Sequence, residues 1–312
     1  MSTMKAIQIN FYGGADVLTY ADVSKPEALA DEILVCIHAT AVNPVDWKIR
    51  EGYLSDWLQH QLPLTLGCEF SGVVAEIGAD VKSFKVGDEV YGYASLMRCG
   101  TYAEFVAVKE KEISAKPANV DFINAAAIPV GALTAWQALF DNANLTTGQK
   151  VLIHAAAGGV GSLAVQLAKA KGAYVIGTTS ARNTEFVKSL GADEVIDYTT
   201  TKFEEVVKDA DVVFDLIGGE TQTRSFGVLK QGGFLVSVVA APDAEALIKY
   251  DVKGTMMGVQ PNTGQLQEIT ALVEAGKLKT FVETVLPLSE IRQAHELSQS
   301  GRTRGKIILQ VS

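Results

Sequence analysis

The sequence predicts an α/β protein in which a β-rich unit, folded as a compact and partly closed β-barrel, accompanies a unit built on a doubly wound parallel sheet. Short apolar runs separated by glycine turns fill the first part of the chain, which is the pattern of a small barrel. From Lys150 onward, apolar strands alternate with helices, as in a parallel sheet that is buried on both faces. A length of 312 residues fits two such domains.

The β-rich pattern occupies the start of the chain, and a mixed pattern closes it. The predicted strands are Met4–Asn10, Glu32–Ala41, Leu66–Ile77 and Glu89–Tyr93. After the α/β segment, helices are expected near Thr263–Ala275 and Leu288–Ser300, followed by a strand at Lys306–Val311. The β-rich unit is therefore either interrupted or followed by the α/β unit.

The α/β pattern is regular enough to assign each element. Its predicted strands are Val151–Ala156, Tyr174–Thr179, Glu194–Tyr198, Val212–Ile217 and Phe234–Ala240. The predicted helices between them are Val160–Lys171, Asn183–Leu190, Phe203–Lys208 and Glu220–Leu229. Apolar strands joined by helices of this length imply parallel neighbours.

Charge and cysteine content exclude several classes of protein. The chain has 27 Lys and Arg against 36 Asp and Glu, a net charge of −9, which argues against nucleic-acid and anionic-membrane partners. The three cysteines, Cys36, Cys68 and Cys99, show no paired metal-ligand spacing and no disulfide framework. Because no secretory signal is visible either, we expect a soluble, cytoplasmic protein.

The segment Lys150–Gly161 is the most informative motif. A strand ends in the sequence AAAGGVG, and a helix follows at once. Such a turn brings the backbone close to a pyrophosphate at a helix N-terminus. Gly158, Gly159, Val160 and Gly161 are therefore predicted to bind a dinucleotide, although Ala156 replaces the first glycine of the usual template. The alternative is a glycine turn that serves packing alone.

The next strand end indicates which dinucleotide is bound. An acidic residue there would accept hydrogen bonds from the ribose of NAD, but the segment Thr178–Asn183 contains none. Ser180 offers a hydroxyl group, and Arg182 offers a guanidinium that suits a 2′-phosphate. The sequence therefore favours NADPH over NADH. Ser180 as a helix cap and Arg182 as a solvated side chain are compatible with this role.

Together these motifs resemble the medium-chain dehydrogenase/reductase superfamily, in its zinc-independent quinone oxidoreductase branch. The resemblance covers essentially the whole chain, and the segments that carry it are Ala41–Asp46, Leu62–Glu69, Gly87–Val90, Gly131–Trp136, Ala155–Gly161 and Gly301–Lys306. It implies a GroES-like β-barrel catalytic domain at 1–124, completed by 263–312. A Rossmann NADPH-binding domain at 125–262 would be inserted between these parts, and the resemblance also implies a homodimer.

The resemblance also bears on metal and catalytic residues. Metal-dependent relatives carry a cysteine where this chain has Asn43 and a histidine where it has Cys68, and an amide cannot replace a thiolate on zinc. No metal is therefore expected. Asn43 and Tyr53 are the candidate catalytic donors, with a turn residue and ordinary loop packing as the alternatives. The tyrosine of quinone-reductase relatives corresponds to Leu54, one residue later.

Further cofactor contacts follow from the same comparison. Thr134 resembles a hydroxyl near the nicotinamide, Tyr198 a neighbour of the 2′-phosphate, and Lys306 a residue that closes over the cofactor. Ile217, Val239 and Ala240 are expected at carboxyl ends of strands, where ligands of open α/β sheets bind. Strand-end apolar residues also occur as plain core.

These features predict an NADPH-dependent oxidoreductase. Without a Lewis acid, incoming hydride needs an acceptor that spreads charge by conjugation, which favours a small conjugated carbonyl substrate. The first hypothesis is a quinone, and the second is an enone or 2-alkenal reduced at its double bond. An enoyl-thioester reductase and a non-catalytic NADPH-binding sensor are further alternatives.

Overall fold

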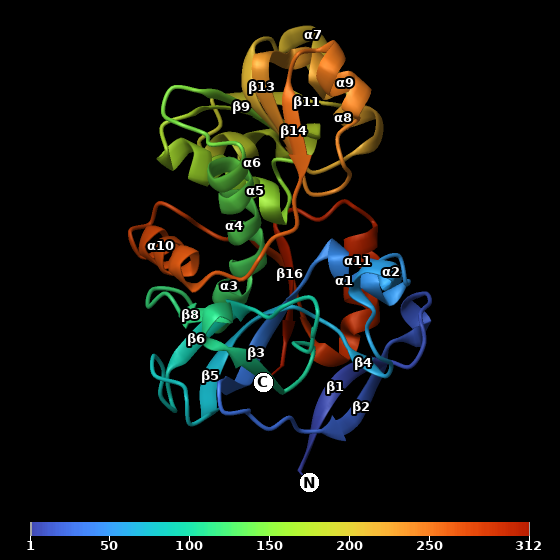
Figure 1. Ribbon diagram of the computed structural model, residues 1–312, viewed down its shortest axis with the longest axis vertical. Helices are drawn as coiled ribbons and strands as arrows, with labels where there is room; N and C mark the ends of the chain where they lie inside the picture. The colour runs from blue at the N-terminus through green and yellow to red at the C-terminus, as the bar shows by residue number, and fades with distance from the viewer. Residues whose placement is uncertain (1, 312) are drawn as a thin grey trace. The chain divides into compact units, whose positions relative to one another are not determined.

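A computed structural model describes residues 2–311 and divides the chain into two compact units. We call them the barrel unit, which contains the residues up to Val130, Gln260–Gly276 and the residues from Thr280 onward, and the sheet unit, which contains Gly131–Val259 and Lys277–Lys279. The predicted α/β class, with a β-barrel-like unit and a parallel sheet, is confirmed (Figure 1). No helix within residues 2–311 has the length and apolar character that crossing a membrane requires.

The barrel unit is organised around the long strand β3 (Glu32–Val42). One half of β3 pairs with β7 (Phe105–Lys109), and the other half pairs with β16 (Lys306–Gln310), while β5 (Glu69–Ile77) pairs along its other edge. The red strand β16 therefore lies beside the blue strand β3, although they are far apart in sequence (Figure 1).

The remaining strands of the barrel unit extend this arrangement. They are β1 (Thr3–Ile9), β2 (Thr19–Ser24), β4 (Leu64–Thr65), β6 (Glu89–Tyr93), β8 (Ile113–Ala115) and β15 (Val282–Pro287). The strand orders are β15-β16-β3-β5-β6-β8 and β2-β1-β4. Its helices are α1 (Pro44–Arg50), α2 (Ser55–Leu58), α3 (Phe122–Ala126), α10 (Thr263–Glu274) and α11 (Ile291–Gln299), and α4 (Pro129–Trp136) begins in this unit.

Alternating residues of β3 form the centre of the barrel core. Ile33, Val35 and Ile37 are fully buried, and they pack with Phe70 of β5 and Val108 of β7. Burying side chains of this size removes apolar surface from water, at roughly 25 cal/mol per Å². Because successive side chains of a strand point to opposite faces, Ile33, Val35 and Ile37 share one face, which packs into the barrel core.

The sheet unit is a parallel sheet with the strand order β11-β10-β9-β12-β13-β14. The strands are β9 (Lys150–Ile153), β10 (Tyr174–Thr179), β11 (Glu194–Asp197), β12 (Ala210–Asp215), β13 (Leu229–Ser237) and β14 (Lys253–Met256). The helices are α5 (Gly159–Ala170), α6 (Thr184–Ser189), α7 (Phe203–Val206), α8 (Gly219–Ser225) and α9 (Ala244–Lys249). Because the strand order reverses between β9 and β12, their carboxyl ends flank a ligand-binding position typical of such sheets.

Four strands of this sheet end earlier than the sequence predicts: β9 ends at Ile153 instead of Ala156, β11 ends at Asp197 instead of Tyr198, and β12 and β13 show the same change. The strand expected at Val212–Ile217 ends at Asp215, and the one expected at Phe234–Ala240 ends at Ser237. In both places, a polar side chain takes the backbone N–H groups that the sheet no longer uses: the Asp215 carboxylate accepts from Ile217 N, and the Ser237 hydroxyl accepts from Val239 N. The predicted helix at Glu220–Leu229 likewise ends at Ser225.

Glycines fix the turn between β9 and α5. A Cβ added at Gly161 would lie 2.2 Å from the carbonyl oxygen of Ala155, so only glycine permits this approach of helix and loop. A Cβ added at Gly158 would lie 3.3 Å from the same oxygen, which is a tight but accommodating contact. Ala156, which departs from the usual glycine template, has its methyl group next to Gly177 of β10, where a Cβ would come within 2.8 Å of it.

A buried histidine lies at the end of β9. His154 shares hydrogen bonds with Thr178 Oγ1 at 3.0 Å and Ser225 Oγ at 2.9 Å, and it is 1% exposed. Burial lowers the pKa of His154 to about 4, because desolvation penalises the charged imidazolium. The side chain therefore stays neutral at physiological pH and joins β9, β10 and α8 through neutral hydrogen bonds.

We expect Gly161→Ala to destabilise the protein by about 1–3 kcal/mol, because the added methyl group forces the helix away from the loop. Gly158→Ala, at an extended backbone position with more space, should change the free energy of unfolding by less than about 1 kcal/mol. Urea unfolding of both variants tests this. Equal losses of stability would contradict the packing role assigned to Gly161.

Acidification should destabilise the protein through His154. Between pH 6.5 and about 4 the unfolded chain binds a proton at this residue and the folded chain does not, so the free energy of unfolding falls as the pH is lowered. His154→Gln removes this contribution and should flatten the slope of stability against pH in that window, even if it lowers stability at pH 7. Parallel slopes for the two proteins would show that His154 does not titrate in this way.

Candidate functional site

The first turn of α5 is the strongest candidate for binding an anion. N–H groups in the first turn of a helix have no partner within the helix, and its dipole adds positive charge there. Gly158 is the N-cap residue and has an extended backbone. Gly158, Gly159 and Val160 are only half-buried, so solvent reaches this turn. Without side chains at the two glycines, the backbone can approach a phosphate directly, so these residues fit a pyrophosphate.

A second group of predicted residues gathers at the end of β10. Ser180 follows the strand, and Arg182 lies exposed in the short turn before α6. Tyr198 directly follows the neighbouring strand β11, and its N–H group donates to the carbonyl oxygen of Thr179 at 3.0 Å. The structure therefore brings Ser180, Arg182 and Tyr198 to one edge of the sheet.

An acidic residue that the sequence analysis did not consider also lies at this edge. Asp197, the last residue of β11, is paired with Thr179 in the sheet register. Its carboxylate accepts hydrogen bonds from the N–H and hydroxyl groups of Thr199, and these together with the Ala181 N–H hold its pKa below the ordinary value. The sequence predicts a parallel sheet but not which strands are neighbours, so the proximity of Asp197 to the Ser180 turn is apparent only from the fold.

The third predicted group lies beyond β12 and β13. Ile217 is 51% exposed and Val239 is 37% exposed, which is unusual for large apolar side chains next to a buried sheet. Ala240 follows Val239 and is half-buried. These residues are therefore not core, and they are placed on the carboxyl edge of the sheet, as predicted for ligand contacts. Thr134, in α4, is 5% exposed.

In the barrel unit, a buried charged cluster surrounds Lys306. Its ammonium group donates to Glu69 Oε1 and, at 2.6 Å, to Asn43 Oδ1. Asn43 Nδ2 donates to the same Glu69 oxygen at 2.9 Å, and the second Glu69 oxygen accepts from Val130 N at 2.8 Å. Glu69 is completely buried, and Lys306 and Asn43 are 6% and 5% exposed. Two predicted residues, Asn43 and Lys306, are thus in direct contact, and Glu69 is a member that sequence reasoning did not assign.

Asp46 and Cys68 complete this cluster. The Asp46 carboxylate accepts from Asn43 N at 2.7 Å and from the Tyr102 hydroxyl at 2.6 Å, while burial raises its pKa to about 6. Burial, together with the nearby Asp46 and Glu69 carboxylates, raises the pKa of the Cys68 thiol well above its ordinary value.

The donor set of the barrel unit does not fit a metal centre. Within residues 2–311, no three His, Cys, Asp or Glu side chains gather closely enough to hold an ion. The Asn43 amide already binds Lys306 and Glu69, so its oxygen faces an ammonium group. The positive charge in this cluster is therefore the Lys306 ammonium group.

Tyr53 lies apart from these buried residues. It is 69% exposed, and its ring makes an edge contact with Trp47, with the centroids 6.2 Å apart. A hydrogen bond to Glu51 raises the pKa of the Tyr53 hydroxyl. The structure therefore does not bring Tyr53 into the network of Asn43.

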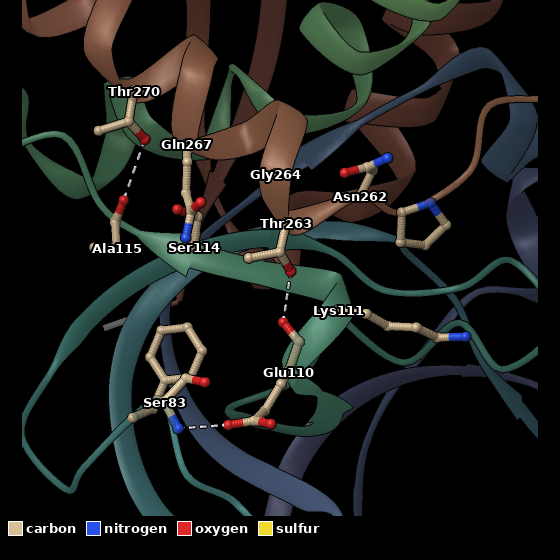
Figure 2. Close-up of a pocket in the computed structure, with 12 residues that line it drawn as sticks. Ser83, Glu110, Lys111, Ser114, Ala115, Asn262, Thr263, Gly264, Gln267 and Thr270 are labelled. Atoms are coloured by element: carbon tan, nitrogen blue, oxygen red, sulfur yellow. Dashed lines mark hydrogen bonds between the residues drawn. The ribbon is translucent and has the colours of Figure 1, made fainter.

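A groove elsewhere in the barrel unit contains none of the predicted residues. It has a volume of about 710 Å³ and lies beside the start of α10 (Figure 2). Figure 2 shows Thr263 of α10 donating to the backbone of Glu110, at 2.7 Å, and Thr270 donating to the backbone of Ala115. These hydrogen bonds join the helix to the strand region, so the polar groups serve the fold.

Comparison with known proteins agrees with this geometry. Residues 29–118 match the family model of the alcohol dehydrogenase GroES-like domain, and residues 190–309 match that of a zinc-binding dehydrogenase. The chain is 38% identical to a chloroplast envelope quinone oxidoreductase homolog of Arabidopsis thaliana, over 98% of each protein. It is 36% identical to the NADPH-dependent alkenal/one oxidoreductase of chloroplasts from the same plant, over 98% of this chain and 79% of that one.

Among solved structures, the quinone oxidoreductase of Coxiella burnetii superimposes with a TM-score of 0.94 at 37% identity, and the match covers 100% of both chains. The predicted family and fold are therefore confirmed. On the strength of its sequence and its fold, the chain belongs to the medium-chain dehydrogenase/reductase superfamily of oxidoreductases, together with the quinone oxidoreductases.

Proposed function

We propose that the protein transfers a hydride from NADPH to a quinone without a metal ion. The observation that carries this proposal is the arrangement at the carboxyl edge of the sheet unit. There the glycine turn opens α5 beside the point where strand order reverses, and exposed polar and apolar residues flank it on either side. The bound NADPH supplies the hydride and its electron pair.

The residues of the sheet unit hold the cofactor in three sections. The N–H groups at Gly159–Gly161 bind the pyrophosphate, and Gly158 gives access to it. Ser180, Arg182 and Tyr198 bind the 2′-phosphate on the side of β10. Because adenosine lies on that side of the reversal point, the nicotinamide lies on the side of β12 and β13, against Ile217, Val239 and Ala240.

The choice of NADPH depends on the balance of charge beside Ser180. Arg182 attracts the 2′-phosphate, and the nearby Asp197 carboxylate opposes it. The donors that surround Asp197, from Thr199 and Ala181, offset part of its charge. The relative named as an NADPH-dependent oxidoreductase also supports NADPH.

In the barrel unit, Lys306 is the residue with the chemistry to stabilise an oxygen that gains charge. A lysine ammonium group has three N–H donors, and Asn43 and Glu69 use two of them. We propose that this ammonium group stabilises the charge that the substrate oxygen gains. Asn43 orients Lys306, and the Tyr53 hydroxyl, held by Glu51, remains the candidate proton donor.

The donors present in the barrel unit support a conjugated carbonyl compound as the substrate. A single ammonium group and neutral donors support a charge that is delocalised over a conjugated acceptor better than a localised alkoxide. Quinones meet this requirement, and relatives with that activity in their names support the choice. The second candidate is an enone or 2-alkenal, which the similarity to the alkenal/one oxidoreductase favours. The homodimer and the cytoplasmic location remain predictions.

Arg182→Ala should weaken the binding of NADPH by about tenfold or more, because it removes a charge-assisted contact to the 2′-phosphate. The binding of NADH should change little. Asp197→Asn is the matched variant of opposite sign at the same edge, and it should strengthen NADPH relative to NADH. Dissociation constants of both nucleotides, measured by titration, test the pair. Equal effects of Arg182→Ala on the two nucleotides would remove Arg182 from the site.

A substrate panel tests the reaction. With NADPH, benzoquinones and naphthoquinones should give the highest kcat/KM, followed by alkenals and enones, with crotonyl thioesters below them. Treatment with a chelator should leave these rates unchanged, and zinc-dependent recovery after it would contradict the metal-free reaction. If no compound turns over while NADPH binds, the protein is a nucleotide-binding sensor and the proposed catalysis is wrong.

A further inference from the structure

A buried carboxylate lies behind the exposed residues of β12 and β13. Asp215 is the last residue of β12 and is completely buried. Its Oδ1 accepts from Ile217 N at 3.0 Å and Gly218 N at 2.8 Å. Its Oδ2 accepts from the Gln222 amide at 2.9 Å and the Ser237 hydroxyl at 2.8 Å. All four neighbours are donors, and a carboxylate, which only accepts, matches such a set.

The hydrogen bonds continue from Asp215 into the next loop. The Ser237 hydroxyl, having donated its proton to Asp215, accepts from Val239 N at 3.1 Å and Ala240 N at 3.3 Å. Gln222 also donates to the carbonyl oxygen of Ala240 at 3.0 Å. The backbones that carry Ile217, Val239 and Ala240 are therefore tied to Asp215 either directly or through one side chain.

The two loops are also in contact with each other. Gly218 has a φ of +76°, and a Cβ there would lie 3.0 Å from Cγ1 of Val239. The loop after β12 thus packs against the side chain that the loop after β13 presents. The hydrogen bonds and this contact therefore link both loops, and the exposed side chains of Ile217 and Val239, to Asp215.

We propose that Asp215 is a positioning residue that sets the shape of the nicotinamide half of the cofactor site. It touches neither cofactor nor substrate, and it acts by fixing the backbones of Ile217 and of Val239–Ala240. This inference rests on the proposed NADPH site. The inference goes further than the proposed site because it assigns the geometry of the nicotinamide half to one buried carboxylate. The turn after β10 sets the geometry of the adenosine half.

Asp215→Asn tests the proposal with little change of volume. The new amide group places N–H donors opposite the donors of Gln222 and Ser237. The hydrogen bonds that these two side chains donate to Asp215 are therefore lost. The control is Asp211→Asn at the other end of β12, where the carboxylate accepts from Lys150 N at 2.7 Å and pairs with Lys230. Both variants disturb the same strand, but only Asp215 lies at the carboxyl edge.

Two ligands separate local positioning from general damage. NADPH contains both halves of the cofactor, and 2′,5′-ADP contains the adenosine and its 2′-phosphate without nicotinamide. Asp215→Asn should raise the Kd of NADPH about tenfold and leave that of 2′,5′-ADP within about twofold. Asp211→Asn should leave both constants near those of the unmodified protein. Equal weakening of both ligands by Asp215→Asn, or unchanged NADPH binding, would overturn the proposal.

Hydrogen exchange gives a readout that needs no cofactor. In the unliganded protein, the amides of residues 217, 218, 239 and 240 should exchange faster in Asp215→Asn than in Asp211→Asn. If Asp215→Asn does not fold, Ser237→Ala should produce the same pattern at 239 and 240, and its absence there would refute the network. If the unmodified protein binds neither nucleotide, the proposed function fails, and unchanged exchange rates would separately refute the role of Asp215 in holding the loops.

Discussion

Where a parallel strand ends, its backbone N–H groups lose their partners, and the acceptor that replaces the neighbouring strand decides the path of the loop that follows. Buried N–H groups must be paired, so this constraint acts at every strand of the sheet unit. After β12 the acceptor is the Asp215 carboxylate, and after β13 it is the Ser237 hydroxyl. The side chains that face a ligand at this edge are thus arranged by polar residues that lie behind them.

In the barrel unit, the main constraint is the burial of the Lys306 ammonium group. Removing an ammonium group from water is costly unless an opposite charge and further hydrogen bonds compensate. Lys306 has a carboxylate and an amide oxygen as partners, and Glu69 is in turn bound by Asn43 and Val130. Since each partner holds the next, the charge is fixed in position, which suits a site that must stabilise an oxygen without reorganising.

Much of the fold could be predicted from the sequence, because apolar periodicity reports which faces are buried. The strands around β9 to β13 and the helix α5 followed from that pattern and from the glycine turn. Strand ends were less accessible, since Asp215 and Ser237 end their strands through hydrogen bonds that periodicity does not encode. The short helix α9 and the edge strand β14 were missed, because each is short and neither contains a fully buried residue.

The candidate site divides in the same way. Motif spacing predicts the Gly158–Gly161 turn as a binding site and, with the resemblance, Asn43 and Lys306 as functional residues, but contacts between distant residues required the fold. Glu69 contacts both Asn43, which lies 26 positions away in the sequence, and Lys306, which lies 237 positions away. Asp197 meets the Ser180 turn only because β10 and β11 are neighbours. Reasoning from residues that are close in the sequence cannot identify contacts of this kind.

The pairing of β16 with β3 has a consequence for how the polypeptide is made. During synthesis, Glu69 and Asn43 leave the ribosome long before Lys306 does. The Glu69 carboxylate therefore lacks its positively charged partner while the sheet unit is synthesised. The sheet unit, which is almost contiguous in sequence, can mature during that interval. Completion of the barrel is therefore a late event in folding, because the buried cation reaches its partners only when β16 pairs with β3.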